Sequence, residues 1–583
     1  MLAPDQVPAT RYGLPTIFGA FACLSFGTAL AGLLGDRDST NITQYFFAVQ
    51  DTPVLGLLGA VFTAFAILTA RGTPSATGPS KRLFGPGFAV AVAIAVTALA
   101  YLGARFVYLS YALSVDEFMA EFDARIFASG RLIAAVAPDW RDYVPAMQPI
   151  FRLPVPDNAF WASLYLPMNA VIRSLFLLAG DPALANAVLA SLAVAALGGV
   201  ARLLWPARPD AAVVAVILLA CSSQFLIMAM TPYAMTAHLA FNLVWLWLFL
   251  RDTRVSHALA APVAFVACGL HQLVFHPLFA APFVLSLFVA RRWTLAAWYT
   301  AVYAVAALFW ILYWSLLLHG VGAPAAAGAD VGMGNFIHRV LGLIAIGPEG
   351  IGLMTLNLLR LLAWQAPIAL PLAIFGLLAA RGRDVMINCL AIGILFMVGL
   401  VLVVLPYQGH GWGYRYLHGF LGSIALMAAY GWIAATQDES SRKPLAVTLA
   451  ASTALAALVL LPWRACQVRS VVAPYAAASQ LIARSKADVV LVDPADSWFA
   501  VDLVRNDPLL RSSPKVMVVG AIDDATLTRL CRSRDVAVFD HADAQRLGIR
   551  DEPLPAAAAE RFRGPRKLMA SLGCGRPVSE TLN

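Results

Sequence analysis

Apolar residues dominate this chain in long runs separated by short polar loops, and the pattern continues to about residue 464. A bilayer core about 30 Å thick needs roughly 20 apolar residues per helix, and most of the runs have that length. They predict thirteen spanning segments, near 13–35, 53–71, 85–110, 182–204, 210–230, 234–251, 256–273, 274–291, 294–318, 350–380, 384–406, 416–436 and 444–464. The 256–291 stretch reads either as two short spans or as a broken pair, and 350–380 is long enough to include an interfacial turn.

Composition supports a membrane protein. The residues are 60% hydrophobic and 13% charged, whereas soluble domains contain roughly 25% charged residues. The formal net charge of +8 comes mostly from Arg and Lys in short loops, so it indicates membrane topology and not a nucleic-acid partner. The seven cysteines are scattered without paired spacing, and we interpret them as small core residues, not as disulfides or metal ligands.

Loop charges predict the orientation of the spans. With the N-terminus inside, each loop expected in the cytoplasm carries at least two positive charges, whereas the short outer loops carry one or none. The inner charges are Arg71, Lys81, Arg82, Arg202, Arg208, Arg251, Arg254, Arg291, Arg292, Arg381, Arg383, Arg442 and Lys443, and the outer ones are Arg37, Arg339 and Arg415. This topology predicts a multi-pass protein of the cytoplasmic (inner) membrane. The large loop 114–181 and the C-terminal segment then lie on the periplasmic side.

The large loop contains two segments that we expect to lie along the membrane surface. Residues 114–132 have helical periodicity, with Phe118, Phe122, Ile126 and Phe127 on one side, and residues 160–180 are apolar but interrupted by Pro167 and Arg173. Such segments are typical of interfacial helices.

The C-terminal segment has a different pattern. The runs DVVLVD (488–493), KVMVVG (515–520) and DVAVFD (535–540) are short β-type runs separated by helical stretches, which predicts a small α/β domain with a parallel sheet. The expected organisation is therefore a transmembrane domain over 1–466 and an extracytoplasmic α/β domain over 467–583.

The acidic pair Asp116–Glu117 opens the large outer loop. A carboxylate that accepts a proton from a sugar hydroxyl needs partial burial and fixed geometry, and the end of a rigid helix supplies both. The alternative is a helix cap, with Ser114 or Asp116 at the N-terminus and acidic residues in the first turn. On spacing alone the two readings stand level.

A family resemblance favours the catalytic reading. The chain resembles the GT-C superfamily of membrane glycosyltransferases over about residues 100–290. The resemblance is carried by Asp116-Glu117-Phe118, Asp123-Ala124, Ser129-Gly130-Arg131-Leu132 and Ser163-Leu164-Tyr165-Leu166-Pro167. Two features depart from the bacterial members: Ser163 and Leu166 alter the motif around Tyr165, and two extra helices precede the acidic loop.

The resemblance implies a GT-C-like all-α fold, a polyprenyl-phosphate sugar donor, an acceptor hydroxyl and inversion at the anomeric carbon. Asp116 is then the base, and Glu117 either supports it or helps to bind a divalent metal; the sequence identifies neither a metal site nor a cofactor. The acceptor is a glycan, a lipid or a protein.

The segment 406–418 is the next candidate. It contains His410, Tyr414, Arg415 and His418 among three glycines that permit close backbone approach to a ligand. Arg415 offers a fork for phosphate oxygens, and the aromatic rings suit stacking on a sugar. The alternative is an aromatic interfacial belt with a glycine turn.

Three further residues are donor-binding candidates. His271 and His276 flank a predicted break before Pro277, the kind of place where substrate sites form. Most of the nine histidines, by our topology, lie near the outer ends of spans, which marks that face as polar. Arg360 lies either at mid-depth in a span, where charge signals function, or on a surface helix.

The sequence thus predicts an inverting glycosyltransferase that acts on the outer face. The alternative of a different class is a transporter or flippase of lipid-linked sugars, which predicts buried charge pairs and repeated halves. A scaffold that binds a partner through its C-terminal segment leaves the polar outer face unexplained.

Overall fold

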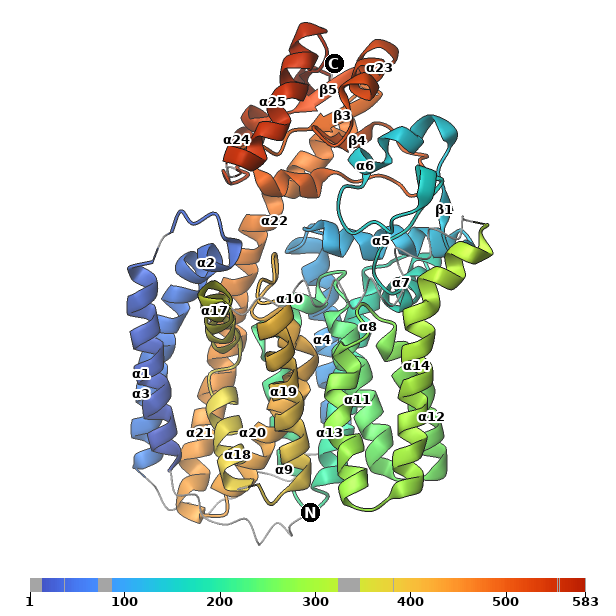
Figure 1. The fold of residues 1–583 in the computed structure, drawn as a ribbon. Coiled ribbons are helices and arrows are strands. Elements are labelled where there is room, and N and C mark those ends of the chain that lie inside the picture. The colour runs from blue at the N-terminus through green and yellow to red at the C-terminus, as the bar shows by residue number, and fades with distance from the viewer. Residues whose placement is uncertain are drawn as a thin grey trace.

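A computed structural model describes residues 13–35, 37–71, 86–322, 347–380, 382–552, 554 and 556–581. Most of the chain forms a bundle of roughly parallel apolar helices, with a smaller α/β part above one end (Figure 1). Lys81, Arg82, Arg339 and Arg381, which belong to the predicted charge pattern, lie outside the described residues.

Every predicted spanning segment contains a helix. The long helices are α1 (Leu14–Leu33), α3 (Thr52–Ala70), α4 (Pro86–Phe106), α8 (Leu184–Leu204), α14 (Trp293–Gly320), α19 (Val385–Val404) and α22 (Leu461–Arg484). The shorter ones are α11 (Met235–Arg251), α12 (Arg254–Cys268), α13 (Phe275–Val289), α20 (Leu421–Ala435) and α21 (Glu439–Leu455). By length and composition, eight stretches of the described chain are sufficient to cross a bilayer, or up to ten with two bent pairs. The protein is a polytopic α-helical membrane protein, and the count of thirteen spans stays a prediction.

Two predicted segments are bent. Helix α9 (Pro209–Ala220) meets α10 (Ser223–Ala229) at 60°, and α17 (Pro348–Trp364) meets α18 (Ala369–Ala380) at 106°. Pro367 lies in the second break, and the residue before a proline is disfavoured in helical conformation. The 350–380 segment therefore does contain a turn, and α17 lies across the axis of α18.

The large loop forms a layer over one end of the bundle. Helix α5 (Val115–Ala128) lies across the spans (Figure 1), and Phe118, Phe122 and Ile126 are buried beneath it. After it come α6 (Val144–Met147), the two-residue antiparallel strands β1 (Ala134–Ala135) and β2 (Phe160–Trp161), and α7 (Met168–Leu178). The apolar face predicted for this segment thus packs against protein.

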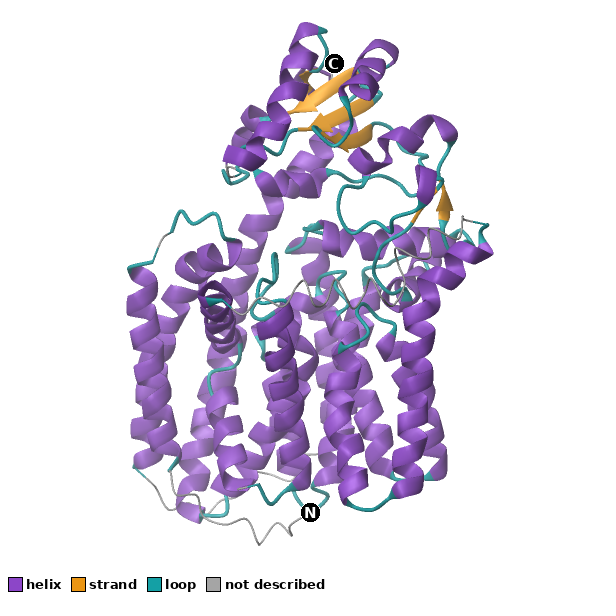
Figure 2. Ribbon diagram, in the orientation of Figure 1, coloured by secondary structure: helices purple, strands orange, loops and turns teal. Residues whose placement is uncertain are grey.

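The C-terminal part holds a four-stranded parallel sheet in the order β4-β3-β5-β6 (Figure 2). Strands β3 (Val489–Val492), β4 (Lys515–Val518) and β5 (Val536–Phe539) fall within the three predicted runs, whereas β6 (Arg576–Pro577) was not predicted. The helices of this part are α23 (Asp524–Ser533), α24 (His541–Leu547) and α25 (Ala556–Ser571). Helix α22 runs through residue 466 without a break, so a continuous helix joins bundle and sheet.

One expectation about the cysteines is wrong. Cys531 and Cys574 form a disulfide with Cα atoms 5.6 Å apart, across 43 residues of sequence. The parallel sheet brings α23 next to the segment that precedes β6, and no local spacing signals such a contact. Of the remaining cysteines, Cys268 and Cys389 are buried, as expected of core residues.

Candidate active site

The site is built on the N-terminus of α5. Ser114 caps the helix, because its hydroxyl accepts from the Glu117 amide while the Glu117 carboxylate accepts from the Ser114 amide at 2.8 Å. This reciprocal capping box follows from the Ser-x-x-Glu spacing. The box fixes the first turn of α5 and directs Asp116 to a different side from Glu117.

Asp116 is held in a buried ion pair. Its Oδ2 lies 2.6 Å from Nη1 of Arg415, and its side chain is 8% exposed. Burial alone favours the protonated acid, but the adjacent Arg415 outweighs it and lowers the pKa of Asp116 below its usual value. The carboxylate is therefore ionised at neutral pH. Oδ1 is buried and makes no close hydrogen bond to a described residue, and the nearby Tyr165 hydroxyl also helps to lower the pKa of Asp116.

Arg415 is positioned by its own loop. Gln408 accepts from the Arg415 amide at 3.0 Å and donates to the Gly413 carbonyl at 3.0 Å, which closes residues 408–415 into a compact turn. Gly413 has a positive φ of 64°, a conformation that glycine adopts without strain. The guanidinium packs on the rings of Tyr233 and Tyr416, and its buried Nε has no hydrogen-bond partner among the described residues.

His271 and Tyr165 complete the cluster. Nε2 of His271 lies 4.0 Å from Oδ1 of Asp116, and the rings of His271 and Tyr165 are 4.0 Å apart between centroids. The Leu166 amide donates to the His271 carbonyl, which ties the loop after β2 to the α12–α13 junction. Asp116, Tyr165 and His271 line one small cavity. The structure thus brings together four residues predicted from distant parts of the sequence.

A second buried acid borders the same cavity. Oδ1 of Asp123 accepts from the Ser163 amide at 2.9 Å. Burial raises the pKa of Asp123 to about 7. This contact anchors the Tyr165 segment to α5, so Asp123 positions the cavity wall.

Two predicted histidines lie elsewhere. His276 is fully buried between Asn242 at 2.7 Å and the Tyr303 hydroxyl at 3.0 Å, so both of its ring nitrogens have partners within the bundle. His418 is fully buried and stacks on Phe225. Neither residue lines the Asp116 cavity.

Tyr414 and His410 also point away from Asp116. The Tyr414 hydroxyl contacts the Met354 sulfur at 3.2 Å inside the bundle. The His410 ring packs on Phe499 of the C-terminal part, with ring centroids 4.3 Å apart, and its Nε2 lies 3.2 Å from Oδ2 of Asp502. His410 therefore lies at the junction of bundle and C-terminal part.

Arg360 occupies a separate buried charge cluster. Its Nε lies 2.9 Å from Asp51, which also binds Arg464 at 2.8 Å and the Trp364 indole at 2.7 Å. All three charged side chains are fully buried. The Arg360 Nη2 donates to the Gly411 carbonyl at 3.0 Å, so this cluster supports the loop that carries Arg415.

Sequence reasoning missed three contributors. Tyr233 packs under Arg415 and bonds the Ser114 hydroxyl at 2.9 Å. Asp502 accepts from the first amide of α5, that of Val115, at 2.7 Å, and Arg505 donates to the carbonyls of the two residues before Ser114. Asp502 and Arg505 lie almost 400 residues from α5, and no local pattern marks them.

The two carboxylates of the acidic pair do not form a joint site. Glu117 is engaged by Ser114, and burial raises its pKa to about 8. Within the described ranges, no group of three or more His, Cys, Asp or Glu side chains is placed to hold a metal ion. In this arrangement Glu117 acts as a capping residue.

Fold and site together define a polytopic α-helical membrane protein with a buried acid–arginine centre at one end of its bundle. No family model matches the chain, and no curated protein matches it. Among solved structures it is similar to ArnT from Cupriavidus metallidurans bound to undecaprenyl phosphate, at 14% identity and a TM-score of 0.48, over 76% of this chain and 88% of that one.

The apo state of the same protein is similar at 13% identity and a TM-score of 0.45, over 84% of this chain and 89% of that one. Both TM-scores are below 0.5, so neither likeness assigns a fold or a function to this chain.

Proposed function

We propose that the protein is an integral membrane glycosyltransferase that moves a sugar from a polyprenyl-phosphate carrier to an acceptor hydroxyl. The observation that carries the proposal is the Asp116 centre. Among the described residues, one oxygen of this buried, ionised carboxylate and one donor of the adjacent arginine make no hydrogen bond. These are the two groups that such a transfer needs: an acceptor for a proton and a cation for a departing phosphate.

Asp116 is the proposed general base. The acceptor hydroxyl donates its proton to Oδ1 as its oxygen bonds to the anomeric carbon, and the bond from that carbon to the phosphate oxygen breaks with the electron pair leaving on the phosphate. Attack opposite the phosphate inverts the anomeric configuration, through an oxocarbenium-like transition state. A phosphate leaves readily, so the centre needs no strong general acid.

Arg415 is the proposed phosphate contact. Its free Nε offers a donor, and its charge stabilises the phosphate as negative charge develops. Phosphate bound there competes with Asp116 for the same guanidinium. Because Arg415 lowers the pKa of Asp116, a bound donor weakens the ion pair and makes the carboxylate a better base. Donor binding thus prepares the base for the transfer step.

We further propose that the reaction takes place on the periplasmic face of the membrane. The positive-inside pattern supports action on the periplasmic face, and the disulfide supports an oxidising compartment for the C-terminal part. The acceptor is a glycan, a lipid or a protein with a free hydroxyl at the membrane surface.

One observation favours a second candidate, a transporter or flippase of lipid-linked sugars. The Asp51–Arg360–Arg464 cluster is fully buried in the protein, and buried charges of this kind line the substrate pathways of transporters. Its contact with the Gly411 carbonyl gives it a supporting role in the transferase.

The test uses protein in lipid nanodiscs with labelled polyprenyl-phosphate sugars and envelope extract as acceptor. A positioned general base contributes roughly 100- to 10,000-fold, so Asp116→Asn should lower release of polyprenyl phosphate by that factor. Asp139→Asn, an exposed acid of the same loop, is the control and should retain the wild-type rate. Release that is equal in wild type and Asp116→Asn contradicts the mechanism. No release from any donor, with lipid-linked sugar crossing proteoliposome membranes, supports the transporter.

A further inference from the structure

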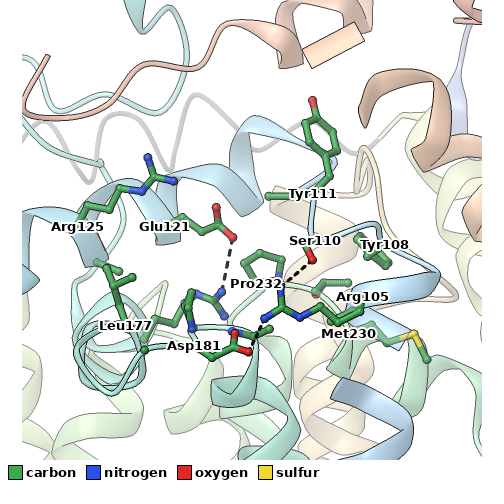
Figure 3. A pocket seen from close by; sticks show the side chains of 18 residues that line it. Arg105, Tyr108, Ser110, Tyr111, Glu121, Arg125, Leu177, Asp181, Met230 and Pro232 are labelled. Carbon is green, nitrogen blue, oxygen red and sulfur yellow. Dashed lines mark hydrogen bonds and ion pairs between the residues drawn. The ribbon is translucent and has the colours of Figure 1, made fainter. Parts of the chain in front are cut away.

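A larger cavity lies on the other side of α5 from the Asp116 site. Its volume is about 320 Å³, and it is lined by the ends of α4 and α5, by α7 and by the 230–232 turn. Pro232 borders both cavities, and Asp116 lines only the smaller one. Figure 3 shows Arg105 reaching toward Ser110 and Asp181, with Glu121 and Arg125 on α5 across from it.

Cations outnumber anions in this cavity. Arg105, Arg125 and Arg173 line it against Glu121 and Asp181, which leaves a net charge of +1 from three cations and two carboxylates. Arg105 pairs with Asp181. The other two arginines are less fully engaged, so the cavity retains positive charge.

Arg173 is a buried arginine whose hydrogen bonds are incomplete among the described residues. It is 3% exposed, its buried Nε has no hydrogen-bond partner among the described residues, and its nearest acid, Glu121, is 3.7 Å away. A buried guanidinium with an unmade hydrogen bond is costly. Arg125 lies on α5, whereas Arg173 lies on α7. The Arg125 side chain is exposed and forms no ion pair with a described residue. Both guanidinium groups line the cavity, and such groups bind anions with several oxygens, such as phosphate.

The surroundings of the cavity are apolar and exposed. Phe106 at the end of α4 and Leu175 and Leu178 on α7 are exposed large hydrophobics next to residues that line the cavity. These helix ends lie at the end of the bundle that carries α5 (Figure 1). A ligand that binds both the arginine-lined cavity and the exposed apolar side chains beside it has an anionic head and an apolar tail.

We infer that this cavity binds the phosphate headgroup of a membrane lipid, in a site separate from the Asp116 centre. The site depends on Arg125 and Arg173 for the phosphate and on the exposed α4 and α7 side chains for the lipid tail. It goes beyond the proposed transfer reaction and does not depend on it.

The test measures equilibrium binding to the full-length protein in detergent by microscale thermophoresis, in an Arg415→Ala background that removes the phosphate contact proposed for the Asp116 centre. The probes are farnesyl phosphate, farnesol and inorganic phosphate, which present head and tail together, the tail alone and the head alone. Losing a charge-assisted hydrogen bond changes affinity by roughly tenfold. We expect Arg125→Gln and Arg173→Gln each to weaken farnesyl phosphate binding by about that factor.

Arg131→Gln is the matched control, because Arg131 is an exposed arginine of the same loop outside the cavity; it should bind as wild type. Arg125 is exposed, so its variant tests the site even if Arg173→Gln fails to fold. Affinity that is unchanged in both variants overturns the inference. Inorganic phosphate that binds as tightly as farnesyl phosphate also overturns it, since the ligand is then a soluble anion. Loss of transferase activity has no bearing on either result.

Discussion

Adjacent carboxylates at the start of α5 have opposite properties. Asp116 faces Arg415, and that cation holds the pKa of its carboxyl below the usual range despite burial. Glu117 faces the interior, where burial raises its pKa to about 8 despite the Ser114 hydrogen bonds. Neighbouring acids with divergent pKa values are typical of sites that need one ionised group. At neutral pH the ionised group is Asp116.

The raised pKa of Glu117 predicts a pH-dependent stability. Between the unfolded value near 4.5 and the folded value near 8, the folded state binds the proton and the unfolded state does not. The free energy of unfolding therefore falls as pH rises through this window. Glu117→Gln, which mimics the neutral acid, should match wild type near pH 5 and melt at a higher temperature near pH 8.

Thermal unfolding in detergent at pH 5, 6, 7 and 8 measures this difference. Asp139→Asn, an exposed acid of the same loop, should follow the wild-type profile. A parallel pH profile for wild type and Glu117→Gln contradicts the assignment of Glu117 as a buried neutral cap.

At the scale of elements, the C-terminal part holds the large loop in place. Asp502 accepts from the Val115 amide at 2.7 Å, Asn506 donates to the Met147 carbonyl at 2.9 Å, and the Trp161 indole donates to the Pro508 carbonyl at 2.8 Å. Amides in the first turn of a helix have no partner within the helix, so Asp502 supplies one. The segment 502–508 therefore positions the helix that carries Asp116.

Asp502→Ala should loosen the start of α5 without removing any group of the Asp116 cavity. Loss of a comparable helix-terminal contact lowers the free energy of unfolding by about 1 kcal/mol. We expect faster amide hydrogen exchange over residues 115–118 and a lower turnover rate, with little change in the pH dependence of the reaction. Asp507→Ala is the control, because the Asp507 carboxylate accepts from the Arg511 amide within its own turn and makes no hydrogen bond to α5 among the described residues. Unchanged exchange in Asp502→Ala contradicts the positioning role.

At the scale of the whole molecule, helix α5 of the large loop and the C-terminal sheet lie at the same end of the bundle (Figure 1), and Asp116 lies in the first turn of α5. The inner-loop arginines that are described, such as Arg251 and Arg292, lie at helix ends away from this site, where Arg292 pairs with Asp252. The disulfide between Cys531 and Cys574 belongs to the C-terminal part at this same end. This segregation agrees with a protein that works on one side of a membrane.

That arrangement predicts where the C-terminus lies in a bacterial cell. Alkaline phosphatase folds in the periplasm, where its disulfides form, so a fusion after residue 583 should be active. A fusion within the loop at residue 253, on the predicted inner side, should be inactive and serves as the control. The reverse pattern contradicts the predicted orientation and moves the site to the cytoplasmic face.

Signals within about 20 residues determined much of the architecture. Apolar run length located the helices, the Ser114–Glu117 spacing specified the start of α5, and β-type runs located three of the four parallel strands. Each signal depends on neighbours in the sequence, because helix length, capping and strand pattern are local properties. Because these signals are local, the sequence alone could not decide whether the acidic pair Asp116–Glu117 caps a helix or supplies a catalytic base.

Only the tertiary structure decided which candidates meet. Asp116 pairs with Arg415 across 299 residues, Arg360 pairs with Asp51 across 309, and Val115 meets Asp502 across 387. It also separated His276, His418 and Tyr414 from the cavity and paired Cys531 with Cys574. Residue type and position along a predicted span were enough to identify these side chains as candidates for a functional site. Helix packing and the docking of the C-terminal part determine their distances, and those depend on the whole chain at once.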